Sequence, residues 1–467
     1  MKRKFLSVLA AVSMVGVLLS GCGGSGQSTT TAAKAAATTA KAAAATTAKA
    51  AAATTKAAAA TTAKAASSGS GQKVTLQFWH AFSGSKNDLV EQMCKDFTAA
   101  HPNIEVVPTY QGDYWTEASK AQSAIAGGDA PDLLIMGADH VSIFASADNM
   151  LADLKPYFQK SNMSTDDLVQ AFSWDYFVDN KLVALPFGRS TPVLYVNTDM
   201  LKEVGKEIPT TWDELHDVCK ALIKKEGNEQ TRYGMAMGYD TWYWFMIVAQ
   251  AGGQFINTER TGLGCVDDGT MATGFKFWQD LHNDGSMFFG PVTDSDTACS
   301  QLFFDGKCGM YLSSVGGLKN VEKNAEGKFN MKLAYVPKGK VQVVPTGGCS
   351  IGMMNSSKHK EEAWEFLHWI LTDPKGGATF CLGTGYLPYT KSMAESDAFK
   401  KYYASDPNAK TAYDQLQFAS DKGHRVPQVG NIMTDLQTAI QAIMYDNSDV
   451  NDQIKKLQSA VADIMKK

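Results

Sequence analysis

The 467-residue chain has few of the patterns that mark a metalloprotein or a nucleotide-dependent enzyme. It has no CxxC pair and no cluster of His and Cys that would predict a metal centre. A glycine-rich phosphate loop of the Walker type is also lacking. The longest apolar run, Phe5 to Leu19, has about 15 residues, which is short for a membrane-spanning helix of roughly 20 residues. We therefore expect no metal, no cofactor and no ATPase site in this chain.

Cysteine is scarce, and its number is unusual for an exported protein. Beyond Cys22 the chain has Cys94, Cys219, Cys265, Cys299, Cys308, Cys349 and Cys381. Exported proteins usually pair their cysteines, yet an odd number cannot all pair within one chain. We interpret most of these residues as small buried apolar side chains. A disulfide between Cys299 and Cys308 stays open as an alternative.

The N-terminus has the order of charge and hydropathy of an export signal. The basic residues at positions 2–4 precede the apolar run, which ends in Leu19-Ser20-Gly21-Cys22. This end resembles the lipobox of bacterial lipoproteins. The resemblance implies that residues 1–21 are a signal peptide removed before Cys22, and that the Cys22 thiol carries a diacylglycerol, whose two acyl chains anchor stably. An ordinary cleaved signal with an incidental cysteine is the alternative.

Residues 22–71 have no residues with which to build a core. From Ser28 to Ala66 the chain is almost entirely Ala, Thr and Lys, with no acidic, aromatic or large apolar side chain. Such a segment has nothing to bury, so we interpret residues 22–71 as a flexible tether. Five lysines spread along the segment are too dilute to predict a nucleic-acid-binding arm.

The body of the chain, residues 72–467, is acidic and long enough for two domains. All 48 acidic residues and 36 of the 44 basic residues follow position 71, which gives the body a net charge of −12. Nucleic acid is therefore not an expected partner. The chain also has 9 Trp, 16 Tyr and 22 Phe, which suits an aromatic-lined site beside a core.

Apolar periodicity predicts strands that alternate with helices. Residues 74–79, 104–107 and 132–136 have the pattern of strands. The pattern of a helix is found at 114–125 and in the stretch with Leu89, Met93 and Phe97 on one face, which stops at His101-Pro102. This alternation predicts an α/β fold with a largely parallel sheet. We further expect helices over 358–371, from Thr210 or Thr211 as N-cap onward, and from Asn431 to the end.

Five segments together resemble the family 1 extracellular solute-binding proteins of ABC importers. They are Phe97–Val106, Gly127–Asp132, Leu185–Asn197, Pro209–Leu215 and Gly385–Pro388. The resemblance implies a periplasmic-binding-protein-like fold of type II, with two α/β lobes hinged around a ligand cleft. Lobe 1 would comprise residues 72–187 and 335–372, and lobe 2 residues 188–334 and 373–467. It also implies a monomer that delivers a small polar solute to ABC permease subunits at the extracytoplasmic face of the bacterial cell membrane.

Within this family the chain is most similar to glycerol-3-phosphate-binding proteins. The similarity lies in segments such as Phe78-Trp79-His80, 108–114, 190–195 and 305–310. Position by position, the ligand contacts implied are Tyr114, Ser190, Tyr239, Trp242, Ser314, Gly348 and Tyr386. Hydroxyls and backbone N–H groups would hold ligand oxygens, and aromatic faces would stack on the ligand. His80 is the histidine nearest to these positions.

Two positions differ from the family pattern. The acidic residue expected after Ala130-Pro131 has no clear counterpart, although Asp139 lies nearby, and the arginine that grips phosphate falls on Met433. Loss of a bidentate phosphate donor is serious. Either Arg189 or Arg425 supplies the charge, or the ligand is a neutral sugar or oligosaccharide.

The aromatic run 238–245 adds a local indication of a ligand site. Five of its eight residues are aromatic, and we expect Trp242 and Tyr239 to face the ligand. Tyr243, Trp244 and Phe245 are expected to belong to the core.

Two enzyme classes and one binding class remain as alternatives. Gly348-Cys349-Ser350-Ile351-Gly352 matches the G-x-S-x-G elbow of α/β-hydrolases, which needs a strand, a tight turn and a helix. The acidic pairs 267–268 and 361–362 could suggest a glycosidase, although surface positions explain them. A surface sensor or adhesion module of the same fold is the third alternative. We expect a binding protein and no catalysis.

Overall fold

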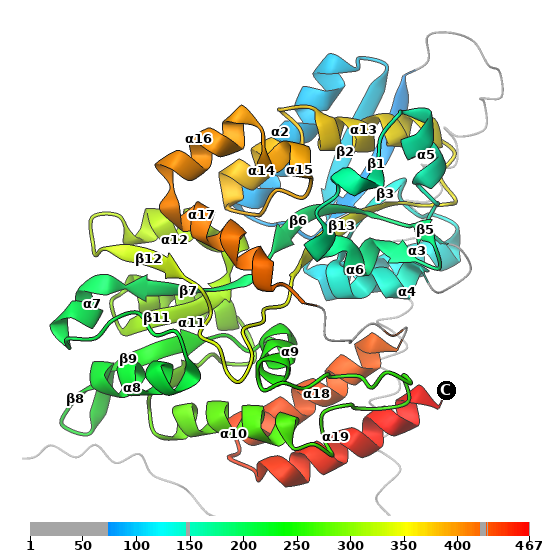
Figure 1. The fold of residues 1–467 in the computed structure, drawn as a ribbon. Helices are drawn as coiled ribbons and strands as arrows, with labels where there is room; N and C mark the ends of the chain where they lie inside the picture. The colour runs from blue at the N-terminus through cyan, green and yellow to red at the C-terminus, as the bar shows by residue number, and fades with distance from the viewer. Residues whose placement is uncertain (1–72, 146–149, 421–425, 427, 467) are drawn as a thin grey trace, which may run out of the picture. The chain divides into compact units, whose positions relative to one another are not determined.

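The computed structural model describes residues 73–145, 150–420, 426 and 428–466. The signal peptide, Cys22, the tether and Arg425 lie outside the described residues. Contacts separate the chain into Met1–Ser70 and Gly71–Lys467, and every described residue belongs to the second unit (Figure 1). No helix within these described ranges is long and apolar enough to cross a bilayer.

A five-stranded mixed sheet forms the centre of the first lobe. Its order is β2 (Ile104–Tyr110), β1 (Val74–His80), β3 (Leu133–Gly137), β13 (Gly347–Met353) and β6 (Leu185–Ser190). β1 pairs in parallel with β2 and β3, whereas β13 is antiparallel to β3 and β6. Every residue of β3 and of β6 is buried. The strands predicted at 74–79, 104–107 and 132–136 are confirmed.

Helices cover this sheet. They include α2 (Ser85–Ala100), α3 (Tyr114–Gly127), α13 (Lys360–Thr372) and α14 (Gly377–Thr384). α2 buries Val90, Met93, Cys94 and Phe97, the i, i+3, i+4, i+7 set of a single face. α3 begins where the Asp113 carboxylate accepts a hydrogen bond from the backbone N–H of Thr116 at 2.8 Å. In Figure 1 the shorter helices α4 (Val141–Ala145) and α6 (Ser173–Tyr176) lie near α3, and α5 (Lys155–Lys160) lies near α13.

A second sheet forms the centre of the second lobe. Its order is β10 (Met287–Phe289), β9 (Glu229–Met237), β11 (Cys308–Ser314), β7 (Pro192–Asn197) and β12 (Met331–Ala334), with β8 (Lys224–Glu226) on β9. β9, β10 and β11 are parallel to one another. The helices of this lobe include α7 (Thr198–Glu203), α8 (Trp212–Leu222), α9 (Thr241–Gln250), α10 (Thr270–Asn283), α11 (Ser295–Phe304) and α12 (Leu318–Ala325).

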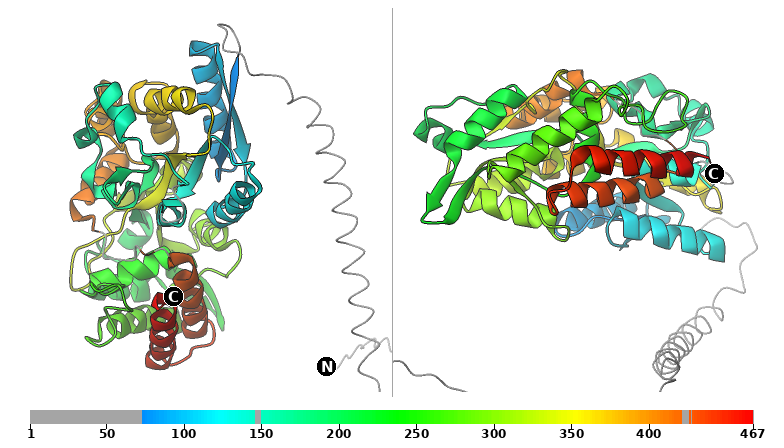
Figure 2. Two further views of the ribbon diagram at one scale, coloured as in Figure 1. Left: turned by 90° about the vertical axis from the view of Figure 1, so that its right-hand side faces the viewer. Right: turned by 90° about the horizontal axis from the view of Figure 1, so that it is seen from below.

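The C-terminal residues form two helices that pack side by side. α18 (Val429–Met444) and α19 (Val450–Met465) lie against each other and against α9 and α10 (Figures 1 and 2). We predicted one helical stretch from Asn431; a break separates the two helices, since Asn447 has a φ of 50°. The Asp449 carboxylate then caps α19 by accepting from the N–H of Asp452 at 3.0 Å.

The chain from residue 373 to α17 does not follow the expected division into lobes. α14 packs on α2 and α13. The chain from residue 373 onward, which we assigned to lobe 2, therefore begins with a helix on the first lobe. α15 (Lys391–Ala394), α16 (Asp397–Ser405) and α17 (Pro407–Asp414) follow, and α17 lies beside β12 of the second sheet. The sequence boundaries of the lobes therefore stay a proposal.

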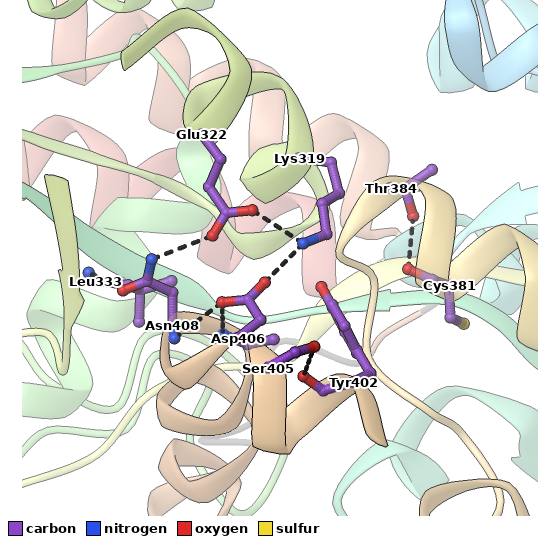
Figure 3. Close-up of polar contacts among 10 residues, drawn as sticks. Lys319, Glu322, Leu333, Cys381, Thr384, Tyr402, Ser405, Asp406 and Asn408 are labelled. Carbon is purple, nitrogen blue, oxygen red and sulfur yellow. Dashed lines mark hydrogen bonds and ion pairs between the residues drawn. The ribbon is translucent and has the colours of Figure 1, made fainter. Parts of the chain in front are cut away.

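A polar network fixes α17 to α12 and β12 (Figure 3). The Lys319 ammonium lies 2.9 Å from a Glu322 carboxylate oxygen and 2.6 Å from an Asp406 carboxylate oxygen. Asn408 donates to Glu322 at 3.1 Å and accepts from the backbone N–H of Leu333 at 2.9 Å. Helices from distant parts of the sequence are thus joined by side chains whose polar atoms satisfy one another.

Three chain segments meet where the sheets adjoin. A single residue, Thr191, separates β6 from β7, and its side chain is fully buried. The Thr191 hydroxyl donates to the carbonyl of Pro345 at 3.0 Å. Next to Pro345, Val344 exchanges backbone hydrogen bonds with Phe418 and Ser420, at 3.1 and 3.0 Å. The connections between the lobes therefore lie side by side.

All seven cysteines of the described residues are free thiols and are buried. The alternative of a disulfide between Cys299 and Cys308 is therefore wrong for this structure, and the interpretation as buried apolar side chains is confirmed. Burial raises the pKa of each of these thiols, which keeps them protonated and unreactive.

Candidate ligand-binding cleft

A cavity of about 440 Å³ lies where the strand ends of the two sheets face each other. This volume is typical of a small-molecule site. The first lobe lines it with the end of β3, the first turn of α3, the end of β6 and the start of β13. The second lobe lines it with the segment after β9, the end of β11 and the first turns of α9 and α11. A ligand in this cavity would contact both lobes.

The structure brings together the seven positions implied by the family resemblance. All of them line the cavity: Tyr114, Ser190, Tyr239, Trp242, Ser314, Gly348 and Tyr386. Met433, at the position where an arginine was expected, lines it as well, and so does Asp139. Their contact with a ligand remains a prediction.

Trp242 lies on the first turn of α9, over the glycine-rich start of β13. The Asp240 carboxylate caps α9 by accepting from the backbone N–H of Trp242 at 2.9 Å. A Cβ on Gly347 would lie 2.9 Å from the Trp242 ring, so only glycine admits the indole there. The Trp242 indole N–H is buried and has no hydrogen-bond partner. It is an unsatisfied donor on a residue that lines the cavity.

Tyr239 and Tyr386 are each positioned by contacts with neighbouring residues. The Tyr239 hydroxyl accepts from the Gln441 amide at 2.8 Å and donates to the carbonyl of Gln437 at 3.2 Å. The Tyr386 ring stacks on Phe380, with centroids 5.7 Å apart. Burial raises the pKa of Tyr114 well above its usual value, so its phenol stays neutral.

The rest of the aromatic run is core, as predicted. Tyr243, Trp244 and Phe245 expose at most 5% of their surface. Tyr243 also reaches the cavity lining.

The cavity lining is acidic. Its described residues include Asp113, Asp139, Asp240 and Asp296, against a single lysine, Lys86. His140 also lines the cavity, and burial lowers its pKa, which favours the neutral imidazole. Among the described residues, no arginine lines the cavity.

Asp240 is the carboxylate most affected by this environment. Its side chain is accessible to solvent within the cleft, but both lobes surround it. This partial desolvation, followed by the charges of Asp139 and Asp296, raises its pKa to about 6, although the bond from Trp242 opposes the rise. Asp296 itself accepts from the hydroxyls of Tyr311 and Ser313.

The proposed role of Arg189 as a ligand cation is wrong. Its guanidinium is fully buried and lies 2.9 Å from the Asp175 carboxylate, and it is not part of the cavity lining. Arg189 also donates to the Ser350 hydroxyl at 3.2 Å. Its charge is therefore neutralised inside the first lobe.

His80 is not part of the cavity lining either. It is 1% exposed, and its Nδ1 accepts from the backbone N–H of Phe82 at 3.3 Å. Burial lowers its pKa to about 4, against a weaker opposite effect of Glu91. His80 is thus a neutral core residue. Arg425 lies outside the described residues.

Ser350 does not form a nucleophile elbow. It lies in the middle of β13, which continues to Met353, and the next helix begins only at Lys360. The side chain is fully buried, and its hydroxyl donates to the Asp175 carboxylate at 2.6 Å. The strand–turn–helix geometry that a hydrolase serine needs is not formed at this position.

A family model described as bacterial extracellular solute-binding protein matches residues 92–411, more than half of the chain. The chain belongs to the bacterial extracellular solute-binding protein family. This membership confirms the predicted family and solute-binding role.

Among curated relatives, this family member is similar to the sn-glycerol-3-phosphate-binding periplasmic protein UgpB of Pectobacterium atrosepticum. The two are 26% identical over 403 residues, which is 81% of this chain and 88% of the relative. UgpB of Escherichia coli K12 is 28% identical over 376 residues, covering 74% of this chain and 82% of the relative. The predicted similarity to glycerol-3-phosphate-binding proteins is confirmed.

Solved structures of binding proteins share the fold. UgpB from Mycobacterium tuberculosis in complex with glycerophosphocholine has a TM-score of 0.75 at 22% identity, over 85% of this chain and 99% of that one. The sugar-binding protein MalE from Xanthomonas citri has a TM-score of 0.69 at 22% identity, over 84% and 98% of the two chains. The prediction of a type II fold with two α/β lobes is confirmed.

Several lining residues were missed in the sequence. They are Lys86, Asp113, Trp115, His140, Asp240, Ser295, Asp296 and Ser313. Asp113 and Asp240 each precede a helix as its N-cap, and polar caps that follow strands point to the strand-end edge where α/β proteins bind ligands. That signal was available, whereas the partners that bring Asp296 into the cavity lie on other elements.

Proposed function

We propose that this protein captures an uncharged, polyhydroxylated solute, such as a sugar or oligosaccharide, and delivers it to the permease of an ABC importer. Tyr114, Trp242 and Tyr386 would provide aromatic faces for the C–H surface of the solute. Ser190, Ser314 and the backbone at Gly348 would hydrogen-bond its hydroxyls. The protein itself would carry out no catalysis.

The observation that carries this proposal is the charge of the cavity lining. In the part of the lining that the structure describes, four carboxylates face one lysine, and the position of the expected phosphate-binding arginine is occupied by Met433, which is 3% exposed. Among the lining residues that the structure describes, a phosphate monoester would meet like charges and an apolar thioether, with no bidentate donor. Sugar hydroxyls, in contrast, can donate hydrogen bonds to carboxylates. The glycerol-3-phosphate named for the relatives is therefore not our proposed ligand.

Capture would involve closure of the two lobes around the cleft. The expected division was 72–187 with 335–372, and 188–334 with 373–467; we propose instead that the lobes divide at the three adjoining connections, near Thr191, Val344–Pro345 and Phe418–Ser420. Because the cavity is lined from both lobes, a ligand would favour the closed form by contacting both.

The location follows from the N-terminal sequence. We propose that Cys22 is lipidated and that residues 22–71 hold the binding domain at the extracytoplasmic face of the cell membrane. Wild-type protein should remain in the membrane fraction after a salt wash, and the Cys22→Ser variant should be released. Equal release of both would contradict the anchor.

A ligand panel measured by thermal unfolding tests the binding proposal. At a ligand concentration of 100 times Kd, binding stabilises by about 2.7 kcal/mol. We expect stabilisation by at least one of a series of mono- to tetrasaccharides, and none by glycerol 3-phosphate. Stabilisation by glycerol 3-phosphate, with no response to any saccharide, would overturn the proposal.

A further inference from the structure

His140 is a buried polar residue of the cleft lining that has no place among the proposed contacts. It ends the short 3-10 helix Ala138–His140, which follows β3 of the first lobe. The residue is 5% exposed, and neither of its ring nitrogens has a hydrogen-bond partner among the described residues. A buried polar atom without a partner is costly, because it gives up hydrogen bonds to water and gains none in return. Packing alone therefore does not account for a histidine at this position.

The two nitrogens of this imidazole have different surroundings. A Cβ on Gly137 would lie 2.5 Å from Nδ1 of His140, so Nδ1 lies against the backbone of its own lobe. Nε2 is farther from Gly137 and is the nitrogen left for a ligand. Burial lowers the pKa of His140, against weaker opposite effects of Asp139 and Asp113, which favours the neutral ring. A neutral imidazole has one N–H donor and one acceptor nitrogen.

The second lobe contributes to the burial of His140. The helix Ala138–His140 packs against α18 of that lobe. The Trp115 ring meets the imidazole edge to face, with centroids 4.0 Å apart. A Cβ on Gly430 of α18 would lie 3.5 Å from the same Trp115 ring. Opening the cleft would move α18 away from Trp115 and His140, and would give water access to the imidazole.

A second unpartnered polar atom lies on the opposite wall of the cleft. The indole N–H of Trp242, on α9 of the second lobe, is buried and has no partner among the described residues. A Cβ on Gly347, at the start of β13, would lie 3.0 Å from the indole nitrogen. A strand of the first sheet thus covers this donor, as α18 of the second lobe adjoins His140. Closure of the empty cleft removes water from polar groups on both walls.

We propose that His140 is a specificity-determining residue, whose imidazole hydrogen-bonds a hydroxyl group of the bound solute and, without that hydroxyl, opposes closure of the empty cleft. The inference rests on the proposed function and names one group that the solute must present. A hydroxyl group suits Nε2 in either tautomer, because it can both donate and accept. A dianionic phosphate can only accept, so it suits one tautomer alone. On the opposite wall, a second solute oxygen would accept from the Trp242 indole.

Spin-label distances in the ligand-free protein test the cost of empty closure. Full-length protein with Cys22→Ser would carry labels at Lys120→Cys on α3 and Lys456→Cys on α19, which are exposed positions on the two lobes. His140→Phe keeps an aromatic ring without polar atoms, so we expect its distance distribution to shift towards shorter values than in the wild type. His140→Gln retains a donor and an acceptor, and its distribution should resemble that of the wild type.

His101→Phe is the matched control. His101 belongs to the same lobe, lies outside the cavity lining and stacks on Phe97, with ring centroids 4.2 Å apart. Its Nδ1 lies 3.1 Å from the Phe97 carbonyl oxygen, so this histidine has a partner. The same substitution at this position should leave the distance distribution unchanged.

Calorimetry tests the contact with the solute. The probes are those mono- to tetrasaccharides that stabilise the wild-type protein against thermal unfolding. We expect His140→Phe to lower their affinity at least about tenfold, because a solute hydroxyl would be left buried without a partner. His140→Gln should lose less affinity than His140→Phe, and His101→Phe should lose none.

The outcome can be separated from the identity of the solute. A distance distribution that is the same in His140→Phe and the wild type would overturn the inference even if saccharides bind. Unchanged saccharide affinity in His140→Phe would overturn it as well, because the hydroxyl would then lie elsewhere. A shift in His140→Phe that is absent from His140→Gln and His101→Phe supports the role of His140 in closure, even if no saccharide binds. In that case the proposed solute class alone would be wrong.

Discussion

Arg189 on β6 and Asp175 on α6 form an ion pair in the interior of the first lobe, with Nη1 2.9 Å from Oδ2. The side chains expose 0% and 1% of their surface. The Ser350 hydroxyl bonds to both partners, and the guanidinium lies 5.0 Å from the centre of the Phe172 ring. The charge of Arg189, which the sequence analysis offered as a ligand contact, is in this way removed from the cleft.

Replacing one partner should destabilise the fold strongly. Arg189→Met leaves the Asp175 carboxylate buried and uncompensated, so we expect the free energy of unfolding to fall by about 3–5 kcal/mol, as measured by urea unfolding. The double variant Arg189→Met/Asp175→Leu should recover most of this loss, because no unpaired charge remains. A single variant as stable as the wild type would contradict the structural role of the pair.

Trp242→Ala should weaken solute binding without unfolding the protein. The indole lies over Gly347 at the cavity wall and its N–H has no partner within the described protein. We expect affinity to fall at least about tenfold, which corresponds to about 1.4 kcal/mol, by calorimetry with the saccharide found in the panel. Tyr110→Ala is the control, since this tyrosine is 50% exposed and lies outside the cavity. Equal losses in the two variants would argue against a ligand-facing indole.

Glu117→Gln should stabilise the protein at neutral and alkaline pH. Glu117 is 1% exposed, neither carboxyl oxygen has a partner, and burial raises its pKa to about 9 from a usual 4.5. Between these two pH values the folded state retains a proton that the unfolded state releases, so stability falls as pH rises through this window.

Glutamine does not titrate, so its advantage should grow with pH. We expect a gain of about 1–3 kcal/mol at pH 7 relative to the wild type, and little difference at pH 4.5, from urea unfolding at each pH. The same offset at both pH values would show that ionisation is not its cause.

A larger side chain at Gly430 should hold the cleft open. A Cβ at this position, on the first turn of α18, would lie 3.5 Å from the ring of Trp115 on α3 of the other lobe. Gly430→Leu should therefore push the lobes apart and weaken solute binding. Gly430→Ala should bind as the wild type does, because 3.5 Å is an ordinary contact distance. Unchanged binding by Gly430→Leu would mean that this contact does not accompany the bound state.

The predictions from sequence were most accurate for features that depend on residues close together in the chain. The helix expected at Thr210 or Thr211 begins with Thr211 as N-cap, whose hydroxyl accepts from the N–H of Glu214 at 3.2 Å. The family positions from Tyr114 to Tyr386 converge on a single cavity because strand ends of an α/β fold share an edge. These results needed no knowledge of distant contacts.

Long-range pairing accounts for the predictions that were wrong. Arg189 meets Asp175, 14 positions earlier, only because α6 packs beside β6 and β13, and no periodicity marks that meeting. His80 ends a strand next to the predicted contacts, yet its ring is turned into the core. Charge and proximity in sequence therefore could not tell a ligand group from an interior pair.

The narrow connection at Thr191 has a mechanical consequence. β6 and β7 are rigid, buried strands in different sheets, and a single residue lies between them. The bond from Thr191 to Pro345 joins this residue to the neighbouring connection, so a movement of one lobe relative to the other would have to take place close to Thr191. A backbone rotation of a few degrees near Thr191 would then displace the residues at the rims of the cleft much more than the residues next to the connection.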